Sequence, residues 1–551
     1  MTTRICALSG EVFEISEREQ AYCEEHAIPF PQAAPRERFR NMFAFGSLTH
    51  LFQTQCAVSG KRLLSFVPPE IGRPVMDVGI WSEDSWDSAS YGVAYNFSRP
   101  FFEQFRELLY RVPLPNLALT KETIENSEYA HGVVSAKNCY LVFGATNIQD
   151  CLFSRYLLNC RDVLDSLMAF DCELCYGCTD IRACYDLKFS EHCTNCSESA
   201  FLSNCRACRH CYGCANLSGK DYYYYNRQLA PKEYEALVGS IDLGSHTALN
   251  AEISRFESFK DTLPLRYMRG DFNEGSSGNF LSHTQRCLDS YFCSDAQDLD
   301  HCLWVFSCHD CFFFCSHGER AERIYNCYGC GTDATNLKFC GECFPNAHDL
   351  EYCLSTSHGS NNCFGCVSMR RKQYCILNRQ YSKAEYFELV GRIKKQMLAS
   401  GEYGRFFPPQ LSPVFYNHSQ AIEFVGGTRA EVEALGYRWK EAEPQVQFAH
   451  DTLPDHIRDL SLDATDKTFA SGAGGAPYRL VRQEIQFYKR MNIAAPRLAP
   501  LERVRLRAKI LRLGDPRQTQ CSRCAAPFES VYATEQREVL CGECFGREVE
   551  R

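Results

Sequence analysis

The feature that most constrains this chain is the spacing of its 34 cysteines. Between residues 139 and 214 they recur at steps of 21, as in the series Cys151, Cys172, Cys193 and Cys214. This repeat is too short for helix-pair modules and lacks the pattern of leucine-rich repeats, but it suits a coil of three short strands and three turns. The spacing predicts a parallel β-helix with about 21 residues per coil, right-handed because parallel crossovers have that hand.

The cysteine-rich region is duplicated in tandem at an offset of 152 residues. Cys-Tyr-Gly-Cys at 211–214 returns as Cys-Phe-Gly-Cys at 363–366, and the residues that follow, up to 239 and 391, match as well. Each copy continues into a predicted helix, which starts near Pro231 in the first copy and at the capping box Ser382–Glu385 in the second. We expect these arms to cap or separate the coils, because an open β-helix end exposes unpaired strand edges.

A second repeat links the two ends of the chain at an offset of 465. Phe13, Glu19, Tyr22 and Arg38 correspond to Tyr478, Glu484, Phe487 and Arg503. Both copies predict a strand, a short helix, a proline-punctuated loop and a basic helix. The domains expected are an N-terminal module (1–60), an α+β linker (61–134), a first β-helix (135–219), a helical arm (220–270), a second β-helix (271–380), a second arm (381–400), a linker with a small α unit (401–475) and a basic helix with a zinc ribbon (476–551).

The cysteines fall into C-x-x-C pairs, a grouping typical of metal ligation. The start of the chain does not read as a signal peptide, and no stretch approaches the 18 consecutive apolar residues of a membrane helix. We therefore expect a soluble cytoplasmic protein with reduced thiols. The net charge of −9 argues against a coat of nucleic acid over the whole surface.

The strongest motif is Cys521-x2-Cys524-x16-Cys541-x2-Cys544. Its two knuckles are spaced so that four thiolates can close a tetrahedron around Zn²⁺. We predict a structural zinc ribbon there.

Further zinc sites are expected where C-x-x-C pairs are one predicted coil apart, because neighbouring coils are about 4.8 Å apart. The alternative is that such cysteines pack as small buried residues, which we expect for the unpaired Cys139, Cys160, Cys184 and Cys287. The candidate sets are Cys172, Cys175, Cys193 and Cys196; Cys340, Cys343, Cys363 and Cys366; and, in the N-terminal module, Cys6, Cys23, His26 and Cys56. With the ribbon these sets predict two to four zinc ions per chain.

The run Cys205-x2-Cys208-x2-Cys211-x2-Cys214 approaches an iron–sulfur spacing. Its last gap is one residue shorter than in that pattern, and Ala215 stands where proline would be. An iron–sulfur electron carrier therefore remains an alternative to zinc or packing here.

The predicted function is a zinc-binding structural or interaction scaffold. A basic stripe beside the ribbon predicts an anionic partner such as nucleic acid, with a solvated helix face as the alternative. The stripe comprises Arg503, Arg505, Arg507, Lys509 and Arg512. A metal or thiol reservoir is the second hypothesis. A β-helix enzyme ranks lower, because the one tight acidic cluster, at 295–301, reads as solenoid turns.

Several segments resemble uncharacterised cysteine-rich, zinc-ribbon-bearing proteins of candidate-phyla bacteria. They are Trp81–Gly92, Ser98–Phe105, Asn126–Tyr129, Lys137–Tyr140, Cys375–Tyr381, Glu402–Phe407 and the terminal ribbon. The chain departs from this pattern at Ala33–Ala34 and at Ser471–Gly475, where further cysteines would be expected. The resemblance implies the architecture and carries no established activity.

Overall fold

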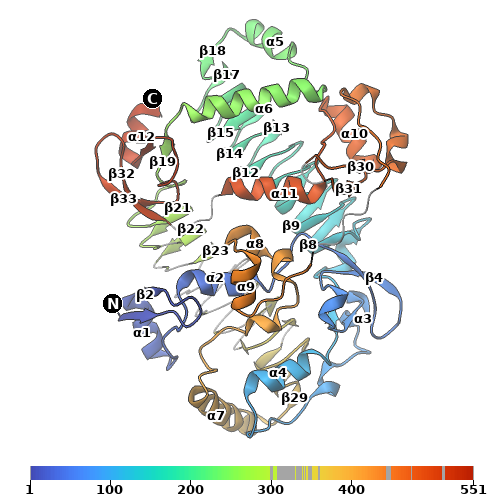
Figure 1. The fold of residues 1–551 in the computed structure, drawn as a ribbon, viewed down its shortest axis with the longest axis vertical. Helices are drawn as coiled ribbons and strands as arrows, with labels where there is room; N and C mark the ends of the chain where they lie inside the picture. Colours follow the sequence, from blue (N-terminus) through green and yellow to red (C-terminus); the bar gives the residue numbers. More distant parts are fainter. Residues whose placement is uncertain are drawn as a thin grey trace.

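The computed structural model describes residues 2–549 except 289, 298, 300–301, 307–324, 326–328, 330–337, 339–340, 342, 345–349, 358–359, 442–447, 473–474 and 512–515. At 303–306, 343–344 and 356–357 it describes the backbone only. The described chain is mainly β, with a β-solenoid of about 17 turns to which helices and small hairpins are attached (Figure 1). The predicted β-helix is therefore confirmed.

The first solenoid has a coil of 12 residues instead of the predicted 21. Its parallel register pairs Val133 with Ala145, Phe143 with Arg155, and Arg155 with Leu167. The coils also begin before residue 135, in the segment expected to be a linker, because β7 already pairs with β8. The strands are β7 (Ile124–Glu125), β8 (Ala130–Lys137), β9 (Val142–Gln149), β10 (Arg155–Arg161), β11 (Leu167–Phe170), β12 (Thr179–Arg182), β13 (Tyr185–Lys188), β14 (Glu191–Thr194), β15 (Ser197–Ser203), β16 (Arg209–Ala215), β17 (Asp221–Tyr224) and β18 (Arg227–Gln228).

A left-handed backbone at every third residue makes this tight coil. It interrupts the extended chain so often that each coil has four sides of three residues. Asparagine and aspartate tolerate this conformation best, and their side chains also bond along the stack, as Asn147 does to Asn159 at 2.8 Å. In three coils the positions with positive φ are Asn138, Leu141, Gly144, Asn147, Asp150, Phe153, Tyr156, Asn159, Asp162, Asp165, Met168 and Asp171.

The interior of the solenoid is narrow, and small side chains fill it. In one coil the buried positions three residues apart hold Leu157, Cys160, Val163 and Ser166. The Cys160 thiol donates to the carbonyls of Leu158 and Ala169, at 3.3 and 3.2 Å. Cysteine here is a compact apolar residue whose thiol is also satisfied. The packing predicted for Cys139, Cys160, Cys184 and Cys287 is confirmed, since all four are buried and donate to carbonyls.

The second solenoid lies beside the first and runs in the opposite direction. At the start of the second solenoid, Arg269 contacts Asn204 of the first at 3.4 Å. About one coil later in the second solenoid, the Phe280 ring lies 5.5 Å from the ring of His192, between centroids. Because His192 is one coil before Asn204, the two solenoids advance in opposite directions. Its described strands are β20 (Gly270–Asp271), β21 (Gly278–Gln285), β22 (Ser290–Gln297), β23 (Leu303–Phe306), β24 (Cys343–Phe344), β25 (Leu350–Glu351), β26 (Thr356–Ser357), β27 (Asn361–Phe364), β28 (Gln373–Ile376) and β29 (Arg379–Gln380).

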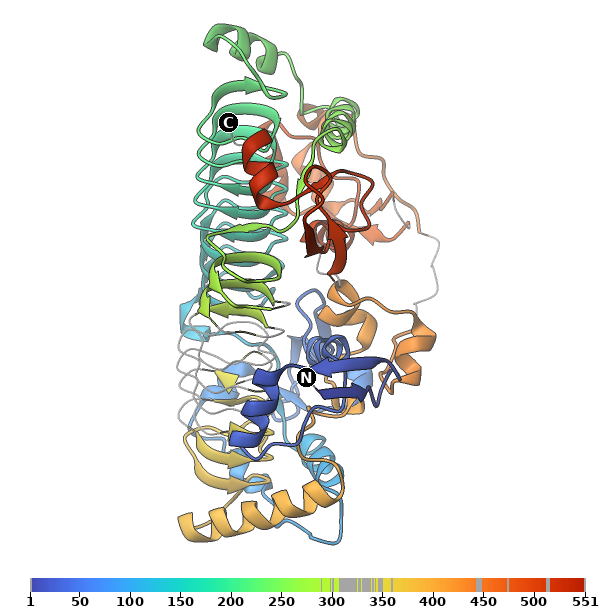
Figure 2. The same ribbon diagram turned by 90° about the vertical axis from the view of Figure 1, so that its left-hand side faces the viewer.

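Helices close the outer ends of the solenoids, as predicted. Figure 2 shows α5 (Pro231–Gly239, green) at one end of the column and α7 (Lys383–Ala399, gold) at the other. Tyr234 of α5 packs on Tyr222 of the last coil, with ring centroids 5.7 Å apart. Helix α6 (His246–Asp261) then crosses the first solenoid (Figure 1).

The terminal modules and the linker cover one side of the column (Figure 2). The N-terminal part contains β1 (Thr2–Ile5), β2 (Val12–Ile15), α1 (Glu17–Glu25), α2 (Pro35–Phe43), β3 (Phe52–Gln55), β4 (Arg62–Ser65), β5 (Val75–Met76), α3 (Val78–Ser82), α4 (Phe101–Leu109) and β6 (Leu114–Pro115). The C-terminal part contains β19 (Leu265–Arg266), α8 (Gln420–Phe424), α9 (Arg429–Ala434), β30 (Phe469–Ala470), β31 (Pro477–Tyr478), α10 (Arg482–Met491), α11 (Pro500–Ala508), β32 (Arg517–Gln520), β33 (Pro527–Ser530), β34 (Val539–Leu540) and α12 (Gly542–Val549).

Candidate metal centre

The first two cysteines of the ribbon lie in the turn between β32 and β33. The Cys521 N–H donates to the Ala526 carbonyl at 2.9 Å, and the Ala525 N–H donates back to Cys521 at 3.0 Å. Ala525 has φ 57°, the left-handed conformation that closes such a turn. The turn thereby brings Cys521 and Cys524 to the same side of the hairpin.

The other two cysteines come from the start of α12. Cys541 immediately precedes the helix and Cys544 lies in its first turn. The four Sγ atoms all lie within 4.8 Å of one another, and those of Cys524 and Cys541 are 3.7 Å apart. Tetrahedral Zn–S bonds of about 2.3 Å require sulfurs about 3.8 Å apart, so the geometry fits a four-coordinate ion.

Backbone N–H groups point at the sulfurs of this site. Cys541 N–H donates to the Cys521 Sγ at 3.4 Å, and Cys544 N–H donates to the Cys541 Sγ at 3.5 Å. Burial raises the pKa of Cys521, but bonds from the N–H groups of Cys524, Cys541 and Arg523 lower it to about 6. These donors favour the thiolate form that a metal ion binds.

The ribbon is fastened to the joint between the two solenoids. Strand β34 pairs in parallel with β19, which connects α6 to the second solenoid. Ser530 donates its hydroxyl to the Tyr267 carbonyl at 2.6 Å. The Tyr532 hydroxyl accepts bonds from Arg269 and Asn279 of the second solenoid, both at 3.1 Å. Any change that loosens the ribbon therefore reaches this joint.

Three other hairpins repeat the ribbon backbone without its four ligands. In each, the residue at the position of Cys521 donates its N–H to a carbonyl five residues later and accepts from the N–H four residues later; these residues are Cys6, Cys56 and Ser471. The Ala34 N–H donates to the Cys6 Sγ at 3.3 Å, and the Ala499 N–H donates to the Ser471 Oγ at 3.1 Å, as Cys541 does in the ribbon. The terminal repeat is thus a pair of two-hairpin units.

The predicted N-terminal site of Cys6, Cys23, His26 and Cys56 is wrong. Cys6 and Cys56 belong to two separate hairpins, each packed in its own small core. Cys23 is on α1 in a third core, where its thiol lies 4.0 Å from the Tyr325 hydroxyl. The shared sequence pattern of Cys6 and Cys56 reflects repetition of a hairpin, and each copy has kept only its first ligand.

The zinc site predicted at Cys172, Cys175, Cys193 and Cys196 is also wrong. With a 12-residue coil the position stacked on Cys172 is Cys184, and the two cysteine pairs are more than one coil apart. Among the described residues, the ribbon is the one group of three or more cysteine, histidine or acidic side chains close enough to share an ion. In the second candidate set Cys340 lies outside the described residues, the side chain of Cys343 is not described, and Cys363 and Cys366 are buried in the solenoid.

The basic stripe is divided between two roles. Arg503 is buried and forms an ion pair with the buried Asp165 of the first solenoid, and Arg507 lies 3.9 Å from the same carboxylate. Arg505 and Lys509 are exposed, whereas Arg512 lies outside the described residues. Arg503 is therefore wrong as a nucleic-acid contact, because it holds α11 on the solenoid.

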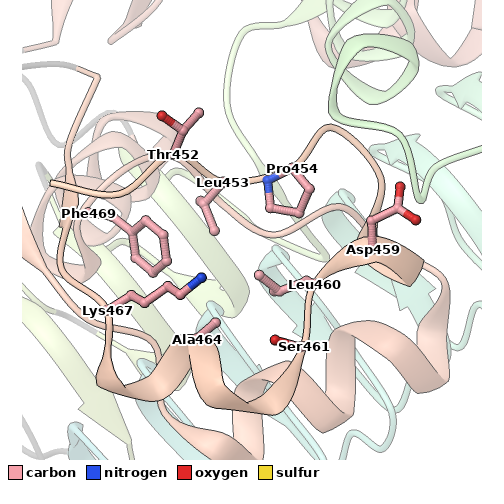
Figure 3. Close-up of a pocket in the computed structure, with 9 residues that line it drawn as sticks. All are labelled: Thr452, Leu453, Pro454, Asp459, Leu460, Ser461, Ala464, Lys467 and Phe469. Carbon is pink, nitrogen blue, oxygen red and sulfur yellow. The ribbon is translucent and has the colours of Figure 1, made fainter.

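A pocket of about 330 Å³ lies in the C-terminal part (Figure 3). Leu453, Leu460, Ala464 and Phe469 line it together with polar residues, and Lys467 extends across it toward Leu460. Asp459 supplies the single carboxylate of the lining, so the pocket lacks the pair of acids that glycoside cleavage needs. In the acidic cluster at 295–301, residues 298, 300 and 301 lie outside the described residues.

Fold and site together define a β-solenoid protein with a four-cysteine group that could hold a metal ion. No protein-family model matches the chain, and no curated protein is significantly similar to it. Over the described ranges, none of the helices combines the length and apolar character needed to cross a membrane.

Proposed function

We propose that the chain is a zinc-stabilised scaffold in which the metal fastens the joint between two β-solenoids. The observation that carries this proposal is the four-thiol group of the ribbon, whose sulfurs lie within 4.8 Å of one another in a module that pairs with β19. Four thiolates in a closed site favour Zn²⁺. Such a site contributes roughly 10–16 kcal/mol of apparent binding free energy, enough to order a module this small.

The environment of the other cysteines favours a scaffold over a zinc reservoir. Of the cysteines whose side chains are described, all but Cys524 and Cys541 are buried, and none forms a disulfide bond. Thiols of the solenoid donate to backbone carbonyls, so zinc binding there would break internal bonds. We propose that the protein works in a reducing, cytoplasmic compartment, because thiols stay reduced there. We also propose that it belongs to the cysteine-rich family that its sequence resembles.

Hydrogen exchange with and without metal tests this proposal. The Leu265 N–H donates to Glu538 at 2.8 Å and the Tyr267 N–H to Leu540 at 2.9 Å, so both depend on a folded ribbon. Chelation of zinc, or Cys541→Ser, should speed exchange of these two amides at least about tenfold, because a structural zinc module unfolds without its ion.

The chain supplies its own control for this experiment. The Leu114 N–H donates to Pro74 at 3.0 Å and the Asn116 N–H to Met76 at 2.8 Å, the same pairing at the metal-free hairpin of Cys56. These amides should keep their protection after chelation. Unchanged exchange at Leu265 and Tyr267, or equal loss at both joints, would contradict a metal-specific fastening.

A further inference from the structure

The N-terminal hairpin of β1 and β2 exposes large apolar side chains. The two strands pair Ile5 with Val12, and these side chains are 71% and 63% exposed. Leu8, in the turn between the strands, is 40% exposed. The other face of the hairpin packs on its own small core around Cys6 and Phe13. Figure 1 shows β2 at the margin of the molecule, so the apolar face is open to solvent.

The other three hairpins of this kind show that the face need not be apolar. In each copy the pair equivalent to Ile5 and Val12 lies one residue before and six residues after the position of Cys521. The equivalent pairs are Gln55 with Arg62, Ala470 with Pro477, and Gln520 with Pro527. None of them has two large apolar side chains, so the hairpin does not require such a pair in order to fold. An exposed apolar patch that folding does not require marks an interaction surface.

The edge of β1 is also available for pairing. The Cys6 N–H donates to the Glu11 carbonyl at 2.7 Å. Backbone groups alternate in an antiparallel ladder, so those of Thr3 and Ile5 point away from β2. Over the described ranges β1 pairs with β2 alone. The strand therefore presents free backbone donors and acceptors beside the apolar face.

The homologous hairpin near the other end of the chain shows what such an edge receives. Thr468, just before β30, is the equivalent of Thr3 at the offset of 465. Its carbonyl accepts the Asp451 N–H at 2.8 Å, and Asp451 pairs in parallel with Phe469. A segment from elsewhere in the chain thus lies along that edge. The occupant expected at β1 is likewise an extended polypeptide segment.

The charges around the apolar face are acidic. Glu14 lies opposite Thr3 in the ladder and two residues from Val12. Glu11 directly precedes Val12, and both glutamates are exposed. Within the described part of the chain neither carboxylate forms an ion pair. A segment that has a basic residue close to an apolar one complements these charges.

We propose that the hairpin β1–β2 binds an extended segment of a partner protein, in which a lysine or arginine lies two residues from an apolar residue. The backbone of the segment pairs with the free edge of β1. Its apolar side chain lies against Ile5 and Val12, and its basic side chain faces Glu14. This surface adds a partner to the proposed scaffold and does not depend on zinc in the ribbon.

Selection of a random heptapeptide library against the full-length protein supplies a probe. Enriched peptides should combine apolar residues with lysine or arginine two positions away, and one of them is labelled and titrated by fluorescence anisotropy. Ile5→Gln with Val12→Arg should weaken its binding at least about tenfold, because the apolar contact is lost. The variant carries the residues that the Cys56 hairpin has at this pair, so it should fold, and circular dichroism verifies this.

Gln55→Ala with Arg62→Ala is the matched control at the equivalent pair, and it should bind the peptide as the wild type does. Glu14→Gln should weaken binding and reduce its dependence on salt concentration, because it removes the charge that the basic residue faces.

Hydrogen exchange reports the backbone pairing. The peptide should slow exchange of the Ile5 amide, which points to the free edge, and leave that of Cys6 unchanged. An absence of enriched peptides, an unchanged Ile5 amide, or equal binding by Ile5→Gln with Val12→Arg and the wild type would overturn the proposal. Dimerisation through this hairpin in analytical ultracentrifugation would also overturn it, since a second copy would then occupy the face. None of these results bears on zinc in the ribbon.

Discussion

At the scale of single residues, the solenoid depends on a backbone conformation that most side chains avoid. Every third residue is left-handed, and residues such as Ala183 (φ 50°) and Ala207 (φ 49°) adopt it without the help of an asparagine side chain. The strain at such a position is on the order of 1 kcal/mol. Parallel pairing on both sides of each coil offsets this cost.

Replacement of Ala183 by asparagine should therefore stabilise the protein. Ala183 is exposed and lies between Asp171 and Asn195 in a column of left-handed residues. The variant should raise the free energy of unfolding by about 0.5–1 kcal/mol, as measured by urea denaturation. Thr194→Asn, at a position of ordinary φ, is the control and should not gain stability. If Ala183→Asn raised the free energy of unfolding no more than Thr194→Asn does, backbone strain would not be the cause.

The residue pattern also explains which predictions from sequence failed. A step of 21 residues equals one full coil of 12 residues plus three further sides of three residues each. Cysteines 21 residues apart therefore lie on different sides of the solenoid and do not stack. The better signal was the step of 12 in Asn147, Asn159 and Asp171, together with the step of three in Cys205–Cys214. Cysteine spacing alone misled because thiols pack on all four sides.

At the scale of elements, helices α10 and α11 are held on the first solenoid by a buried charge network. Arg503 lies between Asp165 and Glu484, and the Tyr488 hydroxyl donates to Glu484 at 2.9 Å. Burial raises the pKa of Glu484 to about 7, although Arg503, the Val481 N–H and Tyr488 oppose the rise. The sequence repeat at offset 465 predicted these helices, but it could not show that their arginine is buried against the solenoid.

This network predicts a pH dependence of stability. Between pH about 4.5 and about 7 the unfolded chain has lost the Glu484 proton while the folded protein retains it, so stability falls as pH rises. Glu484→Gln cannot ionise and removes this contribution. The variant should match the wild type near pH 4.5 and gain on it by up to about 3 kcal/mol at pH 8, by urea denaturation at each pH. A variant that loses stability relative to the wild type as pH rises would contradict the burial of this carboxyl.

At the scale of the whole molecule, the chain contains two related halves, each made of a solenoid whose start pairs with a hairpin module. The hairpin of Cys56 pairs through β5 with β6 at the start of the first solenoid, and the ribbon pairs through β34 with β19 at the start of the second. Sequence comparison found both repeats, at offsets of 152 and 465. It could not show how they fit together, because strand pairing and the opposed direction of the two solenoids are tertiary features.

The two joints differ in one respect that matters for function. The joint at β6 is held by a hairpin that keeps one cysteine, Cys56, and has Ser59 at the position of Cys524. The joint at β19 is held by the ribbon, whose four cysteines could hold a metal ion. Among the cysteines that the structure describes, we propose that those of the ribbon hold zinc, whereas those of the solenoids pack.

Zinc content of the purified protein tests this claim most directly. Elemental analysis after purification without added metal should find zinc, because one described group has the required geometry. Cys541→Ser should lower the zinc content by one ion per chain, and Cys172→Ser should leave it unchanged. A zinc content that stays the same in Cys541→Ser, or that falls in Cys172→Ser, would contradict the assignment of zinc to the ribbon and of packing to Cys172.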